Sequence, residues 1–239
     1  EFRGNAGGEK FQCNIADPVK HQVIDILPSR NTENLCKHFL EYPYKERAAV
    51  KKIVMDLSTL FRSVAKTMFP EAKIVADKFH VIRVVINSLE NVRKRIQKEF
   101  HATKRKWFKR SRYLLLKPEY KLTDEDKTEL ARMLNSSYDL EKAYVLKERF
   151  YEVFRKQTRT EAKKELGKWL LLAADLSLPE FRHCITTFSN WKTEIANIIG
   201  ERVSNGFIEG SNNKIKVLKR ISYGVRNFDR FRNRILYLE

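Results

Sequence analysis

The sequence predicts a mixed α/β fold in which a core sheet with flanking helices is interrupted by a large all-helical insertion. Three observations predict it: short β-prone runs alternate with helical periodicity up to Asp77, purely helical spacing follows from His80, and a glycine-broken polar segment begins near residue 204. We therefore expect a first part of the core at residues 1–98, a helical insertion at 99–200 and a closing part at 201–239.

Turn and capping signals divide the first part of the chain into short elements. Asp17-Pro18 and Pro28 close two β-prone runs whose spacing suits a hairpin. Asn31 is a favourable N-cap for a helix that Pro43 breaks. The expected elements in chain order are strands at 11–16 and 22–27, a helix at 31–42, a strand at 51–55, a helix at 57–68 and a strand at 73–76.

The segment after His80 has helical periodicity without an intervening strand signal. Val81, Val85 and Leu89 begin a long apolar stripe. Thr123, followed by three acidic residues, marks a capped helix start. Further amphipathic helices are expected at 138–157, 159–175 and 179–199.

The charge of the chain favours a polyanionic partner. Lys+Arg 48 against Asp+Glu 30 gives +18 and a pI near 9.8, as expected for a protein that binds nucleic acid or an anionic surface. The charge is clustered in residues 104–112, where Trp107 and Phe108 interleave, and in residues 214–234. One such run is often a solvated helix face, but two runs with aromatic residues favour phosphate contacts and base stacking. The residues expected to bind DNA are Lys104, Arg105, Lys106, Lys109, Arg110, Lys214, Lys216, Lys219, Arg220 and Arg226.

Hydropathy and cysteine usage exclude other classes of protein. No apolar run approaches the ~20 residues that span a bilayer, and the chain opens without a signal peptide. The 3 cysteines form no C-x-x-C pair, so neither a disulfide framework nor a sequence-local zinc site is indicated. The neighbours His183 and Cys184 are expected to pack within a helix. We expect a cytoplasmic protein without a membrane partner.

The segment SNGFIEGSNNKIK, residues 204–216, carries the most specific chemical pattern. If it is helical from residue 208, one face offers a metal ligand, two amide groups and a phosphate partner. Those residues are Glu209, Asn212, Asn213 and Lys216. The opposite apolar stripe, which would pack inward, consists of Ile208, Ile215 and Leu218. Ile221 is a further candidate for this stripe at its C-terminal end. The alternative is a glycine-broken loop that leads into an ordinary basic helix.

Phosphodiester chemistry with two metal ions requires several carboxylates at one point, because the metals lie about 3.5–4 Å apart. Asp56 ends an apolar strand, where ligand sites of α/β sheets are found, although it could instead be the N-cap of the next helix. Asp77 has the same two interpretations, with His80 three residues later. For Asp77 we favour a cap and a supporting role beside the metal ligands.

Two segments carry a resemblance to a known family. MDLSTLFRSVAKTMFPEAKIVADKFHVIR and SNGFIEGSNNKIKVLKRISYGVRNFDRFRNRIL resemble the ISL-three family of insertion-sequence transposases, in the DDE superfamily. The resemblance covers nearly the whole chain and implies an RNase H-like core sheet around a helical insertion. It implies that Asp56 matches the second catalytic acid and Glu209 the third, both as metal ligands. The residues in supporting positions would be Asp77, His80, Asn212 and Asn213.

The first acid of the family lies in an Ile-Asp-Glu-Phe motif, of which Glu1-Phe2 matches the last two positions. The missing Asp would therefore precede Glu1. As given, the chain is expected to be an inactive fragment of the catalytic domain, which lacks the upstream region that reads transposon ends.

The resemblance also implies a cofactor and partners. Mg²⁺, or Mn²⁺, would occupy a two-metal site, and double-stranded DNA of the transposon ends and the target would be bound by a homodimer at the nucleoid. The function implied is metal-dependent cleavage and strand transfer of insertion-sequence ends. Two alternatives remain open, namely an inactive remnant that only binds DNA and an RNase H-like nuclease without strand transfer.

Overall fold

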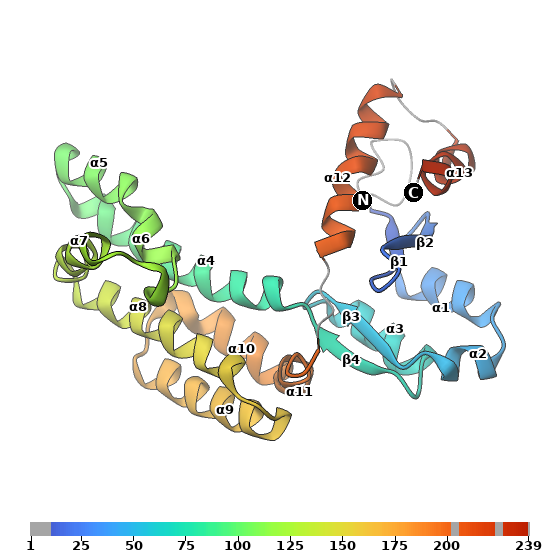
Figure 1. Ribbon diagram of the computed structural model, residues 1–239, viewed down its shortest axis with the longest axis horizontal. Helices are drawn as coiled ribbons and strands as arrows, with labels where there is room; N and C mark the ends of the chain where they lie inside the picture. The colour runs from blue at the N-terminus through green and yellow to red at the C-terminus, as the bar shows by residue number, and fades with distance from the viewer. Residues whose placement is uncertain (1–10, 202–205, 223–226, 239) are drawn as a thin grey trace. The chain divides into compact units, whose positions relative to one another are not determined.

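The computed structural model of the protein describes residues 11–201, 206–222 and 227–238 (Figure 1). The fold is mixed α/β and mostly helical. It divides into two compact units, one formed by residues 1–77 with 202–239 and the other by 78–201. The helical unit begins at Lys78 and not at residue 99, because the first long helix packs against the helices that follow it.

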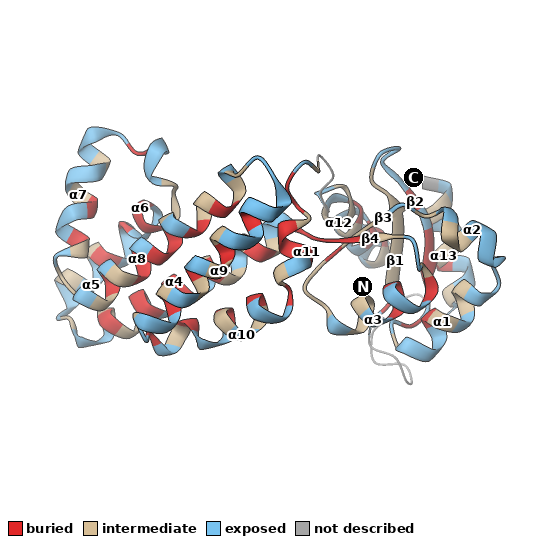
Figure 2. Ribbon diagram, turned by 90° about the horizontal axis from the view of Figure 1, so that it is seen from below, coloured by how far each residue is buried: buried red, intermediate tan, exposed pale blue. Residues whose placement is uncertain are grey.

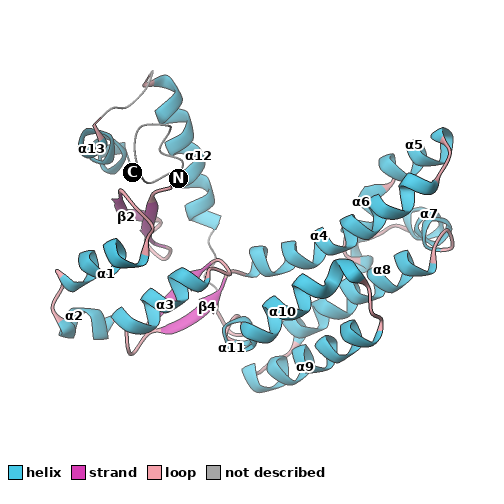
Figure 3. Ribbon diagram, turned by 180° about the vertical axis from the view of Figure 1, so that it is seen from behind, coloured by secondary structure: helices cyan, strands magenta, loops and turns pink. Residues whose placement is uncertain are grey.

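The described part of the first unit contains two short sheets. Strands β1 (Cys13–Asp17) and β2 (Gln22–Leu27) form the expected antiparallel hairpin, and β3 (Lys52–Met55) and β4 (Lys73–Ala76) pair in parallel. Figure 3 shows these strands in magenta. Within the described residues the two pairs share no ladder hydrogen bonds, so the single core sheet expected from the sequence is not formed by these strands.

Three helices connect the strands of the first unit: α1 (Thr32–Leu40), α2 (Tyr44–Ala49) and α3 (Thr59–Met68). The side chain of Asn31 caps α1 by accepting the amide N–H of Asn34 at 2.8 Å. That of Ser58 caps α3 by accepting the amide N–H of Phe61 at 3.3 Å. Apolar side chains of α1 and α3 pack beneath the hairpin, and the buried members of this core are Leu27, Leu35, Val64 and Met68.

The closing helices α12 (Gly206–Ile221) and α13 (Phe228–Leu238) pack against the hairpin. The buried members of this second core are Val23, Ile26, Ile215, Leu218, Phe231 and Ile235. Ser211 is also buried on α12, whereas Ile221 is 56% exposed, so this further candidate for the apolar stripe does not pack inward. An ion pair between Arg232 of α13 and the buried Asp25 of β2, at 2.5 Å, fixes α13 to the same hairpin.

The regular elements of the second unit are all helices in its described residues, and Figure 2 shows buried residues, in red, recurring along these helices. Its centre is aromatic: the rings of Phe150 and Phe188 stack with centroids 5.0 Å apart, and the indole N–H of Trp169 donates to the Leu146 carbonyl at 2.8 Å. The elements are α4 (Lys78–Ile96), η1 (Gln97–Glu99), α5 (Ala102–Arg110), α6 (Arg112–Leu116), η2 (Glu119–Lys121), α7 (Asp124–Leu134), α8 (Tyr138–Tyr151), η3 (Glu152–Arg155), α9 (Arg159–Asp175), η4 (Pro179–Phe181), α10 (Arg182–Asn190) and α11 (Lys192–Ala196).

Polar side chains also join the helices of the second unit. The Arg95 guanidinium of α4 binds Asp139 of α8 at 2.9 Å and Glu180 of η4 at 2.6 Å. The buried Lys147 ammonium donates to the carbonyls of Leu115 and Lys117, at 2.9 and 2.7 Å, where helix α6 ends. These contacts explain why α4 belongs to the helical unit. In the described part of the chain, no helix combines the length and apolar character needed to cross a membrane.

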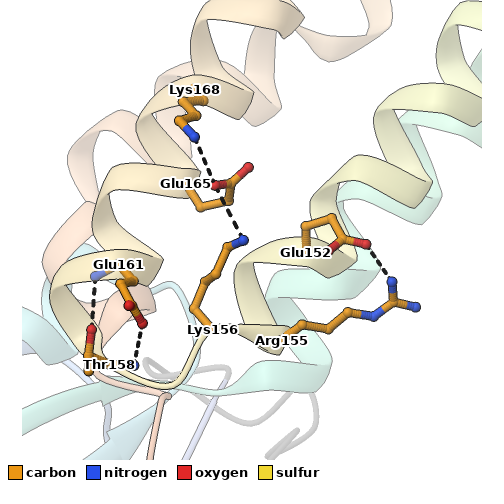
Figure 4. A network of polar contacts seen from close by, with 7 residues as sticks. All are labelled: Glu152, Arg155, Lys156, Thr158, Glu161, Glu165 and Lys168. Atoms are coloured by element: carbon orange, nitrogen blue, oxygen red, sulfur yellow. Dashed lines mark hydrogen bonds and ion pairs between the residues drawn. The ribbon is translucent and has the colours of Figure 1, made fainter.

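Helix α9 begins with a capping box that Figure 4 shows beside neighbouring ion pairs. The Thr158 hydroxyl accepts the Glu161 amide N–H at 3.2 Å, and the Glu161 carboxylate accepts the Thr158 amide N–H at 3.1 Å. One turn further, Glu165 pairs with Lys156 at 3.6 Å and with Lys168 at 3.4 Å. The hydrogen bonds from Thr158 lower the pKa of Glu161 below its ordinary value of 4.5.

We predict that Thr158→Ala lowers the free energy of unfolding of the helical unit by about 1 kcal/mol at neutral pH, because an N-cap is lost. Since Thr158 lowers the pKa of Glu161, this difference should shrink as the pH falls below 4.5 and the carboxylate is protonated. Urea unfolding, with hydrogen exchange at the start of α9 as the readout, measures the loss in free energy of unfolding and its dependence on pH. The control is Thr160→Ala, an exposed threonine in the same turn. An equal loss in the control would show that the capping box is not responsible.

Candidate functional site

The parallel pairing of β3 and β4 brings two acids to the same edge of their sheet. Met55 and Ala76 are partners at the end of the ladder, and the Asp77 amide N–H donates to the Met55 carbonyl at 2.8 Å. Asp56 and Asp77 are therefore equivalent residues beyond two neighbouring strands. Because Ser58 is the N-cap of α3, the alternative in which Asp56 caps that helix is wrong.

His80 lies three residues beyond Asp77, in the first turn of α4. One carboxylate oxygen each of Asp56 and Asp77 and one ring nitrogen of His80 all lie within 4.8 Å of one another. Asp77 is 1% exposed, and the other two side chains are half-buried. Carboxylate oxygens and an imidazole nitrogen are suitable ligands for a divalent cation. The donor set therefore fits a metal, and Asp77, expected only in a supporting role, has its carboxylate in the same cluster as Asp56.

Glu209 lies in the first turn of α12 and is half-buried. The helix begins at Gly206, so the alternative of a loop in this segment is wrong from that residue on, and Ser204 and Asn205 lie outside the described residues. Figures 1 and 3 show the N-terminal end of α12 as the end nearer to the strands β3 and β4. Among the described residues, the carboxylate of Glu209 is not a member of the 4.8 Å cluster.

The polar face of α12 meets the hairpin at one residue that sequence reasoning missed. The Asn14 side-chain N–H of β1 donates to the Asn212 side-chain oxygen at 3.2 Å. Asn213 and Lys216, on the same side of the helix as Asn212, are exposed. No signal in the sequence could have paired Asn14 with Asn212, because the two residues are 198 positions apart.

The basic run of α5 divides into residues that face solvent and residues that hold the helix in place. Lys106, Lys109 and Arg110 are exposed. Arg105 is also exposed, but its guanidinium donates to the carbonyls of Gln97 and Lys98, at 3.3 and 3.0 Å. The Lys104 ammonium lies 4.1 Å from the centroid of the Phe100 ring.

The aromatic residues of this run are used for packing, which corrects the expectation that they stack on bases. Phe108 is 0% exposed, with its ring centroid 5.0 Å from that of Phe100. The indole N–H of Trp107 donates to the Glu129 carboxylate of α7. The aromatic residues lie between the basic ones in the sequence because α5 has an inner and an outer face.

The remaining basic candidates lie mainly on α12. Lys214, Lys216 and Arg220 are exposed, and Lys219 is half-buried. Arg226 lies outside the described residues. The exposed side chains leave the inner face of α12 to the apolar core, so they are available for contacts with an anionic partner.

The three cysteines lie outside the candidate metal cluster. Cys184 is buried in α10, where desolvation raises the pKa of its thiol, so it packs within the helix as expected, whereas His183 is exposed and does not. Burial raises the pKa of Cys13 to about 11. Both thiols are therefore protonated at neutral pH, which makes them poor metal ligands and nucleophiles.

Comparison with known proteins identifies the family. The family model of the ISL-three DDE transposases, described as "Transposase", matches residues 1–235. The transposase for insertion sequence element IS1001 of Bordetella parapertussis is 26% identical over 94% of this chain and 56% of its own length. The transposase for insertion sequence element IS1557 of Mycobacterium tuberculosis (strain CDC 1551 / Oshkosh) is 28% identical over 89% of this chain and 53% of its own length.

One further relative matches only part of this chain, and the comparison with solved structures found no match. A protein of Lactococcus lactis named ATP-dependent protease is 36% identical, but over only 39% of this chain and 26% of its own length. No solved structure matches the chain. The chain spans about half the length of the curated transposases it matches. The family match covers residues 1–235, and this chain therefore belongs to the ISL-three family of transposases.

Proposed function

We propose that this chain is the catalytic part of a DNA transposase, which cleaves insertion-sequence ends and joins them to target DNA by a DDE mechanism. The observation that carries the proposal is the cluster of Asp56, Asp77 and His80 at the carboxyl ends of a parallel strand pair, in a chain of the transposase family. The order of hairpin, parallel strand pair, helical insertion and polar closing helix supports an RNase H-like core.

The acids would hold a divalent metal. Asp56 and Asp77 offer carboxylate oxygens, His80 offers a ring nitrogen, and Glu209 would complete the set from α12. Mg²⁺ or Mn²⁺ supplies Lewis-acid polarisation of the scissile phosphate when bound. By family resemblance, a further acid is expected on the strand that leads into Glu1. Phosphates beside the acids would be oriented by hydrogen bonds and charge from Asn212, Asn213 and Lys216.

Double-stranded DNA is the proposed partner. Lys106, Lys109 and Arg110 on α5 and the exposed lysines of α12 would neutralise phosphates without reading sequence. Recognition of transposon ends, choice of target, assembly as a homodimer and residence at the nucleoid belong to the same proposal for the whole protein. Tight DNA binding without metal-dependent cleavage, by the complete translation product that contains this chain, would instead indicate an inactive remnant.

Metal binding is expected to stabilise the chain. At a Mn²⁺ concentration of about 100 times the dissociation constant, the free energy of unfolding should rise by about 2.7 kcal/mol. Asp77→Asn should remove this increase because it keeps the shape but loses the charge. Thermal unfolding with and without Mn²⁺, together with paramagnetic resonance of the free ion, measures the effect. Asp229→Asn, at an exposed acid of α13, is the control, and an increase that survives Asp77→Asn would contradict the assignment.

Catalysis is expected to depend on both acids of the resemblance. In the complete translation product, Asp56→Asn or Glu209→Gln should reduce metal-dependent nicking of end DNA by more than the ~10–100-fold that the loss of an outer-shell partner costs. DNA binding should largely remain, since the basic and amide side chains proposed to contact phosphates are unchanged in both variants. Glu71→Gln, an exposed acid in the first unit, should leave nicking unchanged. Robust nicking by the Glu209→Gln protein would show that this site is wrong.

The outer face of α5 is expected to contact phosphates. The triple variant Lys106→Ala, Lys109→Ala, Arg110→Ala should weaken binding to any sequence and reduce the slope of log affinity against log salt by up to ~2.7, at ~0.9 for each phosphate contact. A triple alanine variant with the same loss of charge elsewhere is the control, at the exposed residues Lys37, Lys45 and Lys51. Equal slopes for the two variants would mean that only net charge matters.

A further inference from the structure

We propose that the amide bridge between Asn14 and Asn212 fixes the register of α12 on the hairpin and thereby positions Glu209. Asn14 is then a positioning residue for the reaction, although it does not itself touch DNA or metal. The inference rests on the proposed function of Glu209 and adds a determinant that neither the family motifs nor the acidic cluster contains.

The bridge joins the closing helix to the strand nearest it. Asn14 pairs with Ile26 in the hairpin, and its side-chain N–H donates to the Asn212 oxygen at 3.2 Å. Asn212 lies three residues after Glu209, so the two side chains share one face of α12. A displacement of Asn212 along the hairpin would move Glu209 by the same amount.

Most of the rest of this interface is apolar, apart from a ring stack between His21 of the hairpin turn and Phe207 at the start of α12, with centroids 5.5 Å apart. Ile215 and Leu218 of α12 pack against apolar side chains of the hairpin, including Val23 and Ile26. Apolar attraction is non-directional, and an amphipathic helix presents a similar stripe at every turn. A shift of one turn, about 5.4 Å along the axis, would exchange one apolar contact for another. A hydrogen bond has a preferred length and angle, so it distinguishes these positions.

Among the described residues, the bridge leaves one buried polar atom without a partner, which indicates that it has a role other than stability. The side-chain oxygen of Asn14 is buried and has no hydrogen-bond partner in the described part of the chain. Either amide can act as the donor, but a single bridge leaves one buried polar atom unsatisfied in both orientations. Two apolar side chains of similar size would avoid that penalty. Buried amides that are kept despite it specify register in coiled coils, and we assign the same role here.

The test compares Asn14→Leu, Asn212→Leu and the double variant in the complete translation product. Each leucine keeps the side-chain volume and removes the bridge. For Asn14→Leu we expect an unchanged or higher melting temperature, a KM for end DNA within about twofold, and a kcat lower by up to about 10²-fold, which is the cost of a misplacement of about 1 Å. The double variant should lose no more kcat than Asn212→Leu alone, because once Asn212 is replaced the bridge is already gone.

Two further variants separate positioning from other roles. Asn14→Asp should restore most of kcat, since its carboxylate can accept a hydrogen bond from the Asn212 amide. Gln22→Leu removes an exposed amide from the same hairpin and should have no effect. If kcat is unchanged in the double variant while Glu209→Gln abolishes nicking, the positioning role of the bridge is wrong but the proposed function stands. A fall in both melting temperature and affinity would show that the bridge is structural. Full nicking by Glu209→Gln would overturn the proposed function itself.

Discussion

The fold and the candidate site both depend on the parallel ladder between β3 and β4. Each strand has only four residues, and the ladder is stable because its carboxyl end is buried at Met55, Val75 and Ala76. The ladder holds Asp56 and Asp77 so close that, if both are ionised, their oxygens, within 4.8 Å of each other, repel by at least about 3 kcal/mol at an effective dielectric constant of 20. A divalent cation would convert this repulsion into attraction, which is why the cluster favours a metal.

The helical unit has its own buried core, and its exposed residues are left for other contacts. Its aromatic side chains fill the interior, and Arg95 and Lys147 bind polar groups of neighbouring helices. In the basic run of α5 the exposed Arg105 donates to backbone carbonyls, whereas Lys106 and Lys109 are simply exposed to solvent. Positive charge in a sequence is therefore not equivalent to positive charge available to DNA, because packing uses part of it.

The closing helix α12 packs both on the distant hairpin and on the neighbouring helix α13. The helical unit separates α12 from the strands in sequence, so the position of Glu209 is decided where α12 packs on the hairpin. The ion pair of Arg232 with Asp25 fixes the neighbouring α13 to the same strands. An apolar core supplies most of the adhesion between these elements, and a few directional polar contacts decide how they are aligned.

The sequence by itself determined the local elements, because caps, turns and periodicity act within a few residues. Asn31 and Thr123 cap helices as predicted, and α9 spans the predicted residues 159–175. Only tertiary structure decided that Asp77 joins Asp56, that Phe108 is buried, and that the hairpin and the parallel pair form separate sheets in the described residues. It alone brought Asn14 to Asn212, because a hydrogen bond between residues 198 positions apart depends on how whole elements pack.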